Sequence, residues 1–161
     1  MLPEQTLRDA EALLQACRDK QVRIATAESC TGGLIAAALT AIAGASDVLD
    51  RGFVSYSNDA KHDMLGVPLA TIEQHGAVSE EVAAAMATGA LDRSNAGIAI
   101  SVTGLAGPGG GSADKPIGLV CFGIARRDQP PVASEQVFSG DRTAVRAAAV
   151  AHAIALIGQN L

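Results

Sequence analysis

Short apolar segments alternate with amphipathic helical segments along this chain, and that alternation constrains the fold more than any other feature. Strand-like runs at 22–27, 52–56, 97–103, 117–125 and 132–138 are separated by stretches with helical spacing. Strands that alternate with helices favour an α/β fold with a partly parallel sheet. The short connection at 126–131 favours a hairpin, so the sheet is expected to be mixed.

The helical segments are expected at 3–19, 33–43, 58–65 and 68–74, with two more that Ser79 and Asp141 begin as caps. Residues 33–43 are apolar on nearly every side, which predicts a buried helix. The run at 117–125 is apolar on both faces and predicts a central strand, whereas 132–138 predicts an edge strand. Because no repeat, linker or low-complexity tail interrupts the pattern, residues 1–161 are expected to form a single domain.

The composition and charge of the chain limit the classes of molecule that it can bind. The net charge is −5, only 2% of the residues are aromatic, and the Lys and Arg residues are scattered. A nucleic-acid interface needs a basic face and is often supplemented by aromatic stacking platforms, so a nucleic-acid partner is not expected. A single anionic group on a small molecule needs only one or two arginines, so a small-molecule substrate remains compatible with this charge.

The cysteines and the hydropathy of the chain indicate its compartment. Cys17, Cys30 and Cys121 are odd in number and lack paired spacing, which is typical of free thiols in a reducing setting. No secretory signal and no apolar run of transmembrane length is seen. We therefore expect a cytoplasmic protein that does not use the membrane.

The segment Glu28–Gly33 joins a predicted strand to a predicted helix. Ser29 would expose its hydroxyl beside backbone N–H groups at the helix start, which can hold an anion or an oxyanion. Its structural alternative is an ordinary capped helix with glycines for close packing. The spacing differs from the nucleophile elbow of α/β-hydrolases, which needs glycine two residues to either side of the serine.

The segment Tyr56–Lys61 follows the next strand. If Asn58 caps the helix after it, Lys61 lies in the first turn, where the helix dipole lowers a lysine pKa. Such a lysine suits a general base that takes a proton from serine. The alternative for Lys61 is a solvated surface lysine, and for Tyr56 a core or edge position.

Two glycine-containing loops complete the candidate site. The loop that begins at Thr103 and Gly104 and includes Gly107 permits close backbone approach to a ligand, although it is neither a Walker A loop nor a Rossmann fingerprint. Its alternative is a flexible loop. Gly140 and Arg142 open the last helix, where arginine and backbone amides together could hold a phosphate, and plain capping is the alternative there.

Metal ligation is weakly supported, because His62, His75 and His152 share no ligand spacing. Cys30 is a conceivable nucleophile, but no histidine is evidently paired with it. We therefore expect neither a metal nor a cofactor.

Five motifs together resemble one known family, the CinA C-terminal domain family, which includes the nicotinamide-nucleotide amidohydrolases of the PncC type. They stand in family order and spacing over nearly the whole chain at 27–33 (AESCTGG), 51–58 (RGFVSYSN), 75–79 (HGAVS), 103–108 (TGLAGP) and 138–142 (FSGDR). Each motif alone is weak, but the ordered set is specific.

The resemblance implies a three-layer α/β/α fold and hydrolysis of nicotinamide mononucleotide to nicotinic acid mononucleotide and ammonia, in pyridine-nucleotide recycling. It carries the family's serine, tyrosine and lysine to Ser29, Tyr56 and Lys61. Many relatives have a second, N-terminal domain that this sequence lacks, so its activity is not expected here. The residues expected to bind the substrate, taken from the turn and loops described above, are Thr31, Gly32, Gly33, Thr103, Gly104, Gly107, Gly140 and Arg142.

Other functions stay open from the sequence. One is a non-catalytic nucleotide-binding or regulatory module connected with competence and DNA damage, and another is an amidase for a different substrate. A hydrolase that uses Cys30 is a third. The Ala-rich apolar faces make a homo-oligomer, in particular a dimer, the expected assembly.

Overall fold

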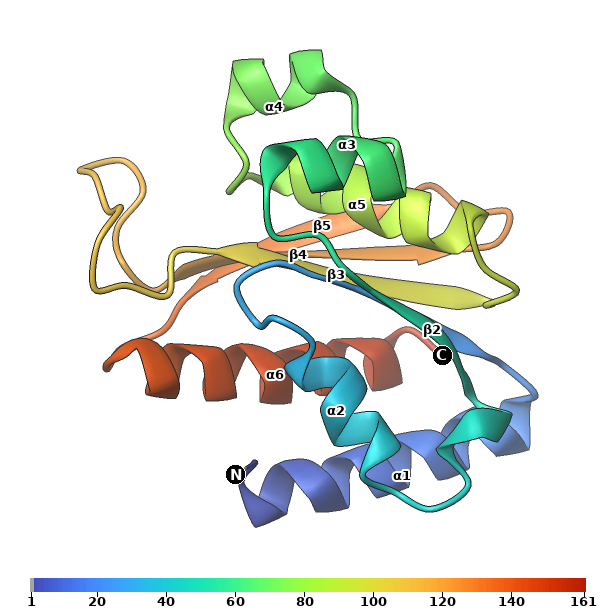
Figure 1. Cartoon of the computed structure of the whole chain (residues 1–161). Coiled ribbons are helices and arrows are strands. Elements are labelled where there is room, and N and C mark those ends of the chain that lie inside the picture. The colour runs from blue at the N-terminus through green and yellow to red at the C-terminus, as the bar shows by residue number, and fades with distance from the viewer. Residues whose placement is uncertain (1) are drawn as a thin grey trace.

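A five-stranded mixed sheet lies between two layers of helices in the computed structural model, which describes residues 2–161 (Figure 1). Helices α1, α2 and α6 cover one face, and α3, α4 and α5 lie on the other. The elements, with one 3₁₀ helix, are α1 (Glu4–Lys20), β1 (Ile24–Glu28), α2 (Leu34–Thr40), η1 (Ala45–Asp47), β2 (Leu49–Val54), α3 (Asn58–Leu65), α4 (Leu69–His75), α5 (Glu80–Asp92), β3 (Ile98–Gly104), β4 (Leu119–Arg126), β5 (Val132–Val137) and α6 (Arg142–Gln159).

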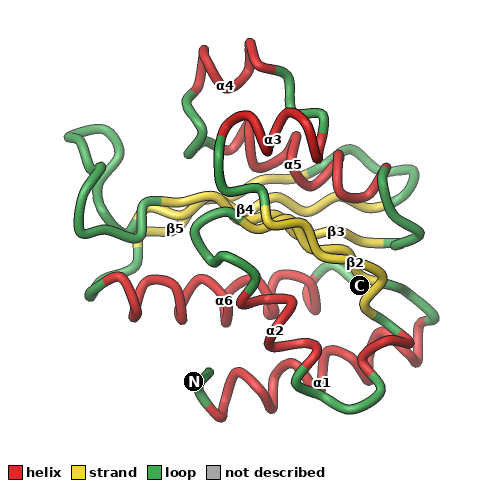
Figure 2. Tube along the Cα trace, viewed as in Figure 1, coloured by secondary structure: helices red, strands yellow, loops and turns green. Residues whose placement is uncertain are grey.

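The strand order is β2-β1-β3-β4-β5. Strand β1 is parallel to both β2 and β3, whereas β4 and β5 are antiparallel to their neighbours. The prediction of a mixed α/β sheet is therefore confirmed, as are the internal position of β4 and the edge position of β5. Strand, helix and loop follow one another in Figure 2 as the alternating pattern predicts.

The parallel pairing brings three strand ends to one edge. Glu28, the last residue of β1, is in register with Val54 of β2 and Val102 of β3. Each of the first two predicted motifs follows the carboxyl end of one strand of this parallel group, and the third begins in the last residues of β3. Ligands of open α/β sheets bind at that edge.

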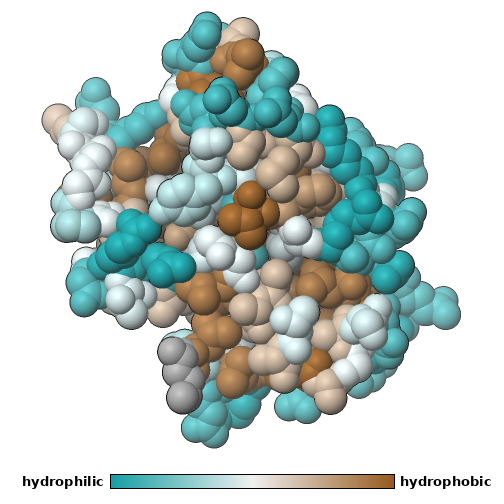
Figure 3. Space-filling model, in the orientation of Figure 1, coloured by the Kyte–Doolittle hydropathy of each residue, from teal (hydrophilic) through white to brown (hydrophobic). Residues whose placement is uncertain are grey.

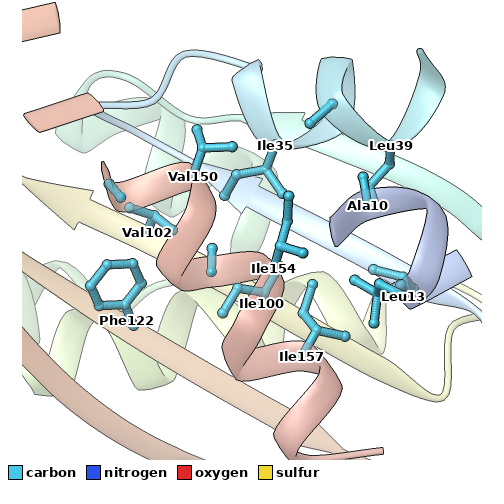
Figure 4. Packing of buried hydrophobic residues seen from close by; sticks show 14 of the residues in the cluster. Ala10, Leu13, Ile35, Leu39, Ile100, Val102, Phe122, Val150, Ile154 and Ile157 are labelled. Carbon is cyan, nitrogen blue, oxygen red and sulfur yellow. The ribbon is translucent and has the colours of Figure 1, made fainter. Parts of the chain in front are cut away.

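Two apolar cores flank the sheet. The larger one joins α1, α2 and α6 to the sheet, with Ile35, Ile100 and Ile154 among its buried members, and Figure 4 shows their side chains packed together. The smaller core includes Val82 and Met86 of α5. With few aromatics available, aliphatic side chains and alanines fill both layers, and these allow close packing of helices on the sheet.

Three local predictions need correction. Strand β2 spans Leu49–Val54 rather than 52–56, because pairing with β1, and not its own hydropathy, determines its length. Helix α2 is Leu34–Thr40 and buries one face only, since Ala37 and Thr40 face solvent. The cap of α3 is Ser57, whose Oγ accepts the Ala60 N–H at 3.0 Å, and not Asn58. The predicted caps Ser79 and Asp141 are confirmed.

The surface carries an apolar groove. It lies between α1 and α6, has a volume of about 440 Å³, and is lined by residues such as Ala12, Leu13 and Ile154. Figure 3 shows apolar surface in the same half of the molecule, below the sheet. The expected homo-oligomer stays a prediction. Within residues 2–161, no helix has both the length and the apolar character needed to span a membrane.

Candidate active site

The turn after β1 is held in place by backbone hydrogen bonds. Ser29 N–H donates to Val102 O of β3 at 2.9 Å, and Gly32 N–H closes the turn on Ser29 O at 3.0 Å. Gly32 and Gly33 have φ angles of +59° and +97°, a region that side chains disfavour. These contacts explain why two glycines follow the serine, and they place Ser29 at the carboxyl edge of the sheet.

The Glu28 side chain occupies the start of α2. It is 1% exposed, and its carboxylate accepts the N–H groups of Gly33, Ile35 and Ala36 at 3.1, 3.0 and 2.9 Å. The first N–H groups of a helix lack partners inside the helix, and a carboxylate also complements the positive end of the helix dipole. The expectation that these N–H groups are free to hold an anion therefore needs correction, because Glu28 already binds them.

Lys61 of α3 is buried against Ser29. The lysine is 1% exposed, and its Nζ lies 3.1 Å from Ser29 Oγ and 3.0 Å from Ser55 O. Among residues 2–161, no carboxylate lies within ion-pair distance of Nζ. Burial without a counter-ion disfavours the ammonium form, so the pKa of Lys61 is lowered from its ordinary value by desolvation.

The lowered pKa of Lys61 agrees in direction with the sequence prediction, but its main cause is burial rather than a position near a helix N-terminus. A solvated surface lysine is excluded by the geometry. The two side chains are 32 residues apart in sequence. They meet because β1 and β2 are parallel neighbours, and the chain crosses from the end of β2 to the helix layer above the sheet.

Cys30 lies beside the serine but is in an unreactive state. Its side chain is buried, and that burial raises the pKa of the thiol to about 11. Because the thiolate is the nucleophilic form of cysteine, this residue is protonated near neutral pH. The geometry therefore favours Ser29, which contacts Lys61, over Cys30 as the nucleophile.

Tyr56 and Arg142 form a bridge at the rim of the site. Tyr56 is 58% exposed, and its hydroxyl accepts a hydrogen bond from Arg142 Nη2 at 2.9 Å. Arg142 Nη1 donates to Gly107 O at the same distance. The bridge thus joins the start of α6, the β3–β4 loop and the β2–α3 connection. In the described part of the chain, no hydrogen bond joins Tyr56 to either Ser29 or Lys61.

A pocket of about 200 Å³ contains these groups. Six of the predicted catalytic and substrate-binding residues line it, namely Ser29, Tyr56, Lys61, Thr103, Gly104 and Arg142. The Thr103 hydroxyl donates to Ala77 O at 2.8 Å, so it ties β3 to the segment before α5. The larger groove between α1 and α6 holds none of these residues.

The other residues named from the sequence lie elsewhere. Thr31 is fully buried, and Gly32 and Gly33 shape the turn without lining the pocket. Gly107 meets the site through its carbonyl oxygen, which Arg142 binds. Gly140 precedes α6, where the Asp141 side chain accepts the Ala144 N–H at 2.9 Å. The start of α6 is therefore capped by a carboxylate.

Sequence reasoning missed several groups. The Ser55 carbonyl binds Lys61, and Arg146 binds the carbonyls of Cys30 and Thr31. A backbone carbonyl leaves no sequence signal, but Glu28 and Arg146 do. Glu28 is a charge at the end of an apolar strand. Arg146 lies one helical turn after Arg142, on the same face of α6.

The histidines have separate environments. His62 Nδ1 lies 2.9 Å from Val67 O, His75 faces Glu81, and His152 packs against the Phe122 ring. Across residues 2–161, His, Cys, Asp and Glu side chains do not gather into a group of three that could hold a metal ion.

Comparison with known proteins gives one consistent family. Residues 7–161 match the model of the CinA C-terminal domain. The chain is 58% identical over 123 residues to the nicotinamide-nucleotide amidohydrolase PncC of Enterobacter agglomerans, covering 76% of this chain and 75% of that one. It is 45% identical over 160 residues to the protein of the same name from Escherichia coli K12, covering 99% and 97%.

Solved structures agree with the fold. The crystal structure of the competence/damage inducible protein CihA from Agrobacterium tumefaciens superposes with a TM-score of 0.95 at 48% identity, covering 100% of this chain and 99% of that chain. Some other relatives with competence-damage names are longer, and the chain spans only 33% to 38% of their length.

Proposed function

The chain belongs to the CinA C-terminal domain family, and from that premise we propose that it hydrolyses nicotinamide mononucleotide to nicotinic acid mononucleotide and ammonia. Support comes from the names of relatives that are 45% to 58% identical over most of the chain. We further propose that Ser29 is the nucleophile and that the reaction serves pyridine-nucleotide recycling.

The observation that carries the mechanism is the contact between Ser29 Oγ and Lys61 Nζ at 3.1 Å. An unactivated serine hydroxyl is a weak nucleophile and needs an adjacent base. A buried lysine with a lowered pKa supplies that base in its neutral form. The Ser55 carbonyl accepts one Nζ hydrogen, which leaves the nitrogen lone pair free to face the serine hydroxyl.

The first half of the reaction makes an acyl-enzyme. Ser29 Oγ attacks the carboxamide carbon while its proton passes to Lys61 Nζ. The tetrahedral intermediate then collapses, and the Lys61 ammonium returns that proton to the departing nitrogen, so that ammonia leaves. The direct contact makes Lys61 the immediate base, and Tyr56, which is bound to Arg142, is assigned to the substrate-facing rim.

The second half hydrolyses the ester. Neutral Lys61 takes a proton from water as the hydroxide adds to the acyl carbon. The bond from that carbon to Ser29 Oγ then breaks, and the Lys61 ammonium returns its proton to Oγ. The substrate assists both halves, because its positively charged pyridinium ring makes the carbon of the carboxamide, and later that of the ester, more electrophilic. Arg142 lines the pocket and is assigned to pair with the substrate phosphate, a pairing for which a guanidinium is well suited.

The test is ammonia release from nicotinamide mononucleotide by the unaltered protein, Ser29→Ala and Lys61→Met, without added metal and again with a chelator. Both variants are expected to lose about 10⁴-fold or more in kcat. Lys20→Met is the matched control, because Lys20 is an exposed lysine that contacts the Leu161 carbonyl far from the site. It should keep full turnover.

An acid quench during turnover should trap the nicotinoyl nucleotide as an ester on the peptide that contains Ser29. Full turnover by Ser29→Ala would refute the serine mechanism. No turnover by the folded, unaltered protein would move the assignment to another amide substrate or to a regulatory role.

A further inference from the structure

The backbone donors of the Ser29 turn are almost all occupied. Each N–H group from residue 32 to residue 36, together with that of Ser29, has a partner. Ser29 N–H donates to Val102 O, Gly32 N–H to Ser29 O, and Leu34 N–H to Thr31 O. The N–H groups of Gly33, Ile35 and Ala36 donate to the Glu28 carboxylate. The start of α2 is therefore not available to a ligand.

Two donors remain. Among residues 2–161, the N–H groups of Cys30 and Thr31 have no oxygen partner. Cys30 lines the pocket that contains Ser29, whereas Thr31 is fully buried. The Cys30 N–H lies beside its own sulfur, which is a weak acceptor. Buried backbone donors are rarely left without a partner, so the Cys30 N–H is open to an incoming oxygen.

Arg146 holds the peptides next to this donor. It lies one turn after Arg142 on α6, and it donates from Nε to Cys30 O and from Nη2 to Thr31 O, both at 3.1 Å. In the described part of the chain, no carboxylate pairs with Arg146. Its charge is therefore directed at two carbonyl oxygens of the turn that carries the nucleophile.

These contacts fix the direction in which the Cys30 N–H group points. A trans peptide points its C=O and N–H in opposite directions. The Gly32 N–H fixes the Ser29 carbonyl, and Arg146 fixes the Cys30 carbonyl. The two peptide planes on either side of Cys30 are thus both held, and the Cys30 N–H is turned away from the group that binds Ser29 O.

We propose that the Cys30 N–H is the oxyanion donor and that Arg146 is the positioning residue that holds it. This inference rests on the proposed function, since it needs Ser29 to attack a carboxamide. When Oγ bonds to the carboxamide carbon, the C=O π electrons move to the oxygen, and the Cys30 N–H binds that oxyanion. The contact strengthens in the transition state, so its loss lowers kcat and leaves KM nearly unchanged.

The test uses Arg146→Met, Arg146→Lys and Arg146→Ala. Removal of an oxyanion donor costs about 10²–10³-fold in kcat, and a misplaced donor costs less, so Arg146→Met is expected to lose about 10–100-fold. Arg146→Lys, which can reach one carbonyl, should lose less. Millimolar guanidinium ion should partly restore the kcat of Arg146→Ala by occupying the vacated position.

The matched control is Arg127→Met. Arg127 also donates to backbone carbonyls, those of Ala96, Leu91 and Ser94, but it follows β4 at the other end of the sheet. Its loss should lower the melting temperature with kcat unchanged. Melting curves of both variants therefore separate a loss of stability from a loss of catalysis.

A transition-state probe gives a second readout. 3-Formylpyridine mononucleotide should form a hemiacetal with Ser29, and Arg146→Met should weaken its inhibition by a larger factor than it changes KM. The proposal would be overturned if Arg146→Met changed the inhibition constant and KM by equal factors. It would also be overturned if Arg146→Met left kcat unchanged, or if Arg127→Met lowered kcat by the same factor as Arg146→Met. If the unaltered protein releases no ammonia, the proposed function itself has failed, which is a different result.

Discussion

Glu28 offers the sharpest test of how the catalytic turn is built. In Glu28→Ala, three backbone N–H groups at the start of α2 lose their acceptor. The Ile35 N–H is buried, so its loss costs about 1–3 kcal/mol. The Gly33 and Ala36 N–H groups are only part-buried, and water can replace the carboxylate there at about 0.5–1 kcal/mol each. The expected destabilisation is about 2–5 kcal/mol, which corresponds to roughly 4–20 °C in Tm.

The measurement is urea unfolding of the unaltered protein and of Glu28→Ala and Glu28→Gln, compared at a common m-value. Glu28→Gln keeps the shape and one carbonyl oxygen, but its amide N–H₂ faces a backbone donor, so its stability should fall between the other two. Glu11→Ala, at an exposed position of α1, is the control and should change the free energy of unfolding by no more than about 0.5 kcal/mol. A Glu28→Ala value within about 1 kcal/mol of the unaltered protein would refute the assigned role of the carboxylate.

Four further predictions concern the pocket. Burial lowers the pKa of Lys61, and the base acts in its neutral form. A plot of kcat/KM against pH should therefore rise and level off above that lowered pKa. A flat profile between pH 5 and 9 would contradict the assignment of Lys61 as the base. Gly104→Ala would place a Cβ 2.9 Å from Leu119 O and 3.1 Å from Cys30 Sγ, so urea unfolding should show a loss of about 1–3 kcal/mol. Burial raises the pKa of Cys30 to about 11. Iodoacetamide at neutral pH should therefore label Cys30 slowly in the folded protein and faster in urea. Rapid labelling of the folded protein would contradict the raised pKa. Arg142→Met should raise KM for the nucleotide several-fold more than it lowers kcat, as steady-state kinetics would show.

Much of the fold could be predicted because its signals are local. Period-2 and helical spacing depend on which side of an element is buried, so they identify strands and helices from neighbouring residues alone. The caps Ser79 and Asp141 are local in the same sense, since each bonds an N–H three residues further on. The limits of β2 were predicted less well, because the partner strand determines them.

The candidate site likewise has features that the sequence predicts and features that depend on tertiary contacts. From the sequence by itself, the Ser29 turn and the Lys61 segment are assigned to the ends of two strands, and the family motifs link them to amide hydrolysis. Only the tertiary structure decided that Lys61 is buried against Ser29, that Glu28 binds the start of α2, and that Arg146 binds the turn. Each of these contacts joins elements through the order of strands and the layer on which a helix packs, and burial is what lowers the lysine pKa. A charged residue looks the same in sequence whether it faces water or the core, so the electrostatics of this site are decided by packing.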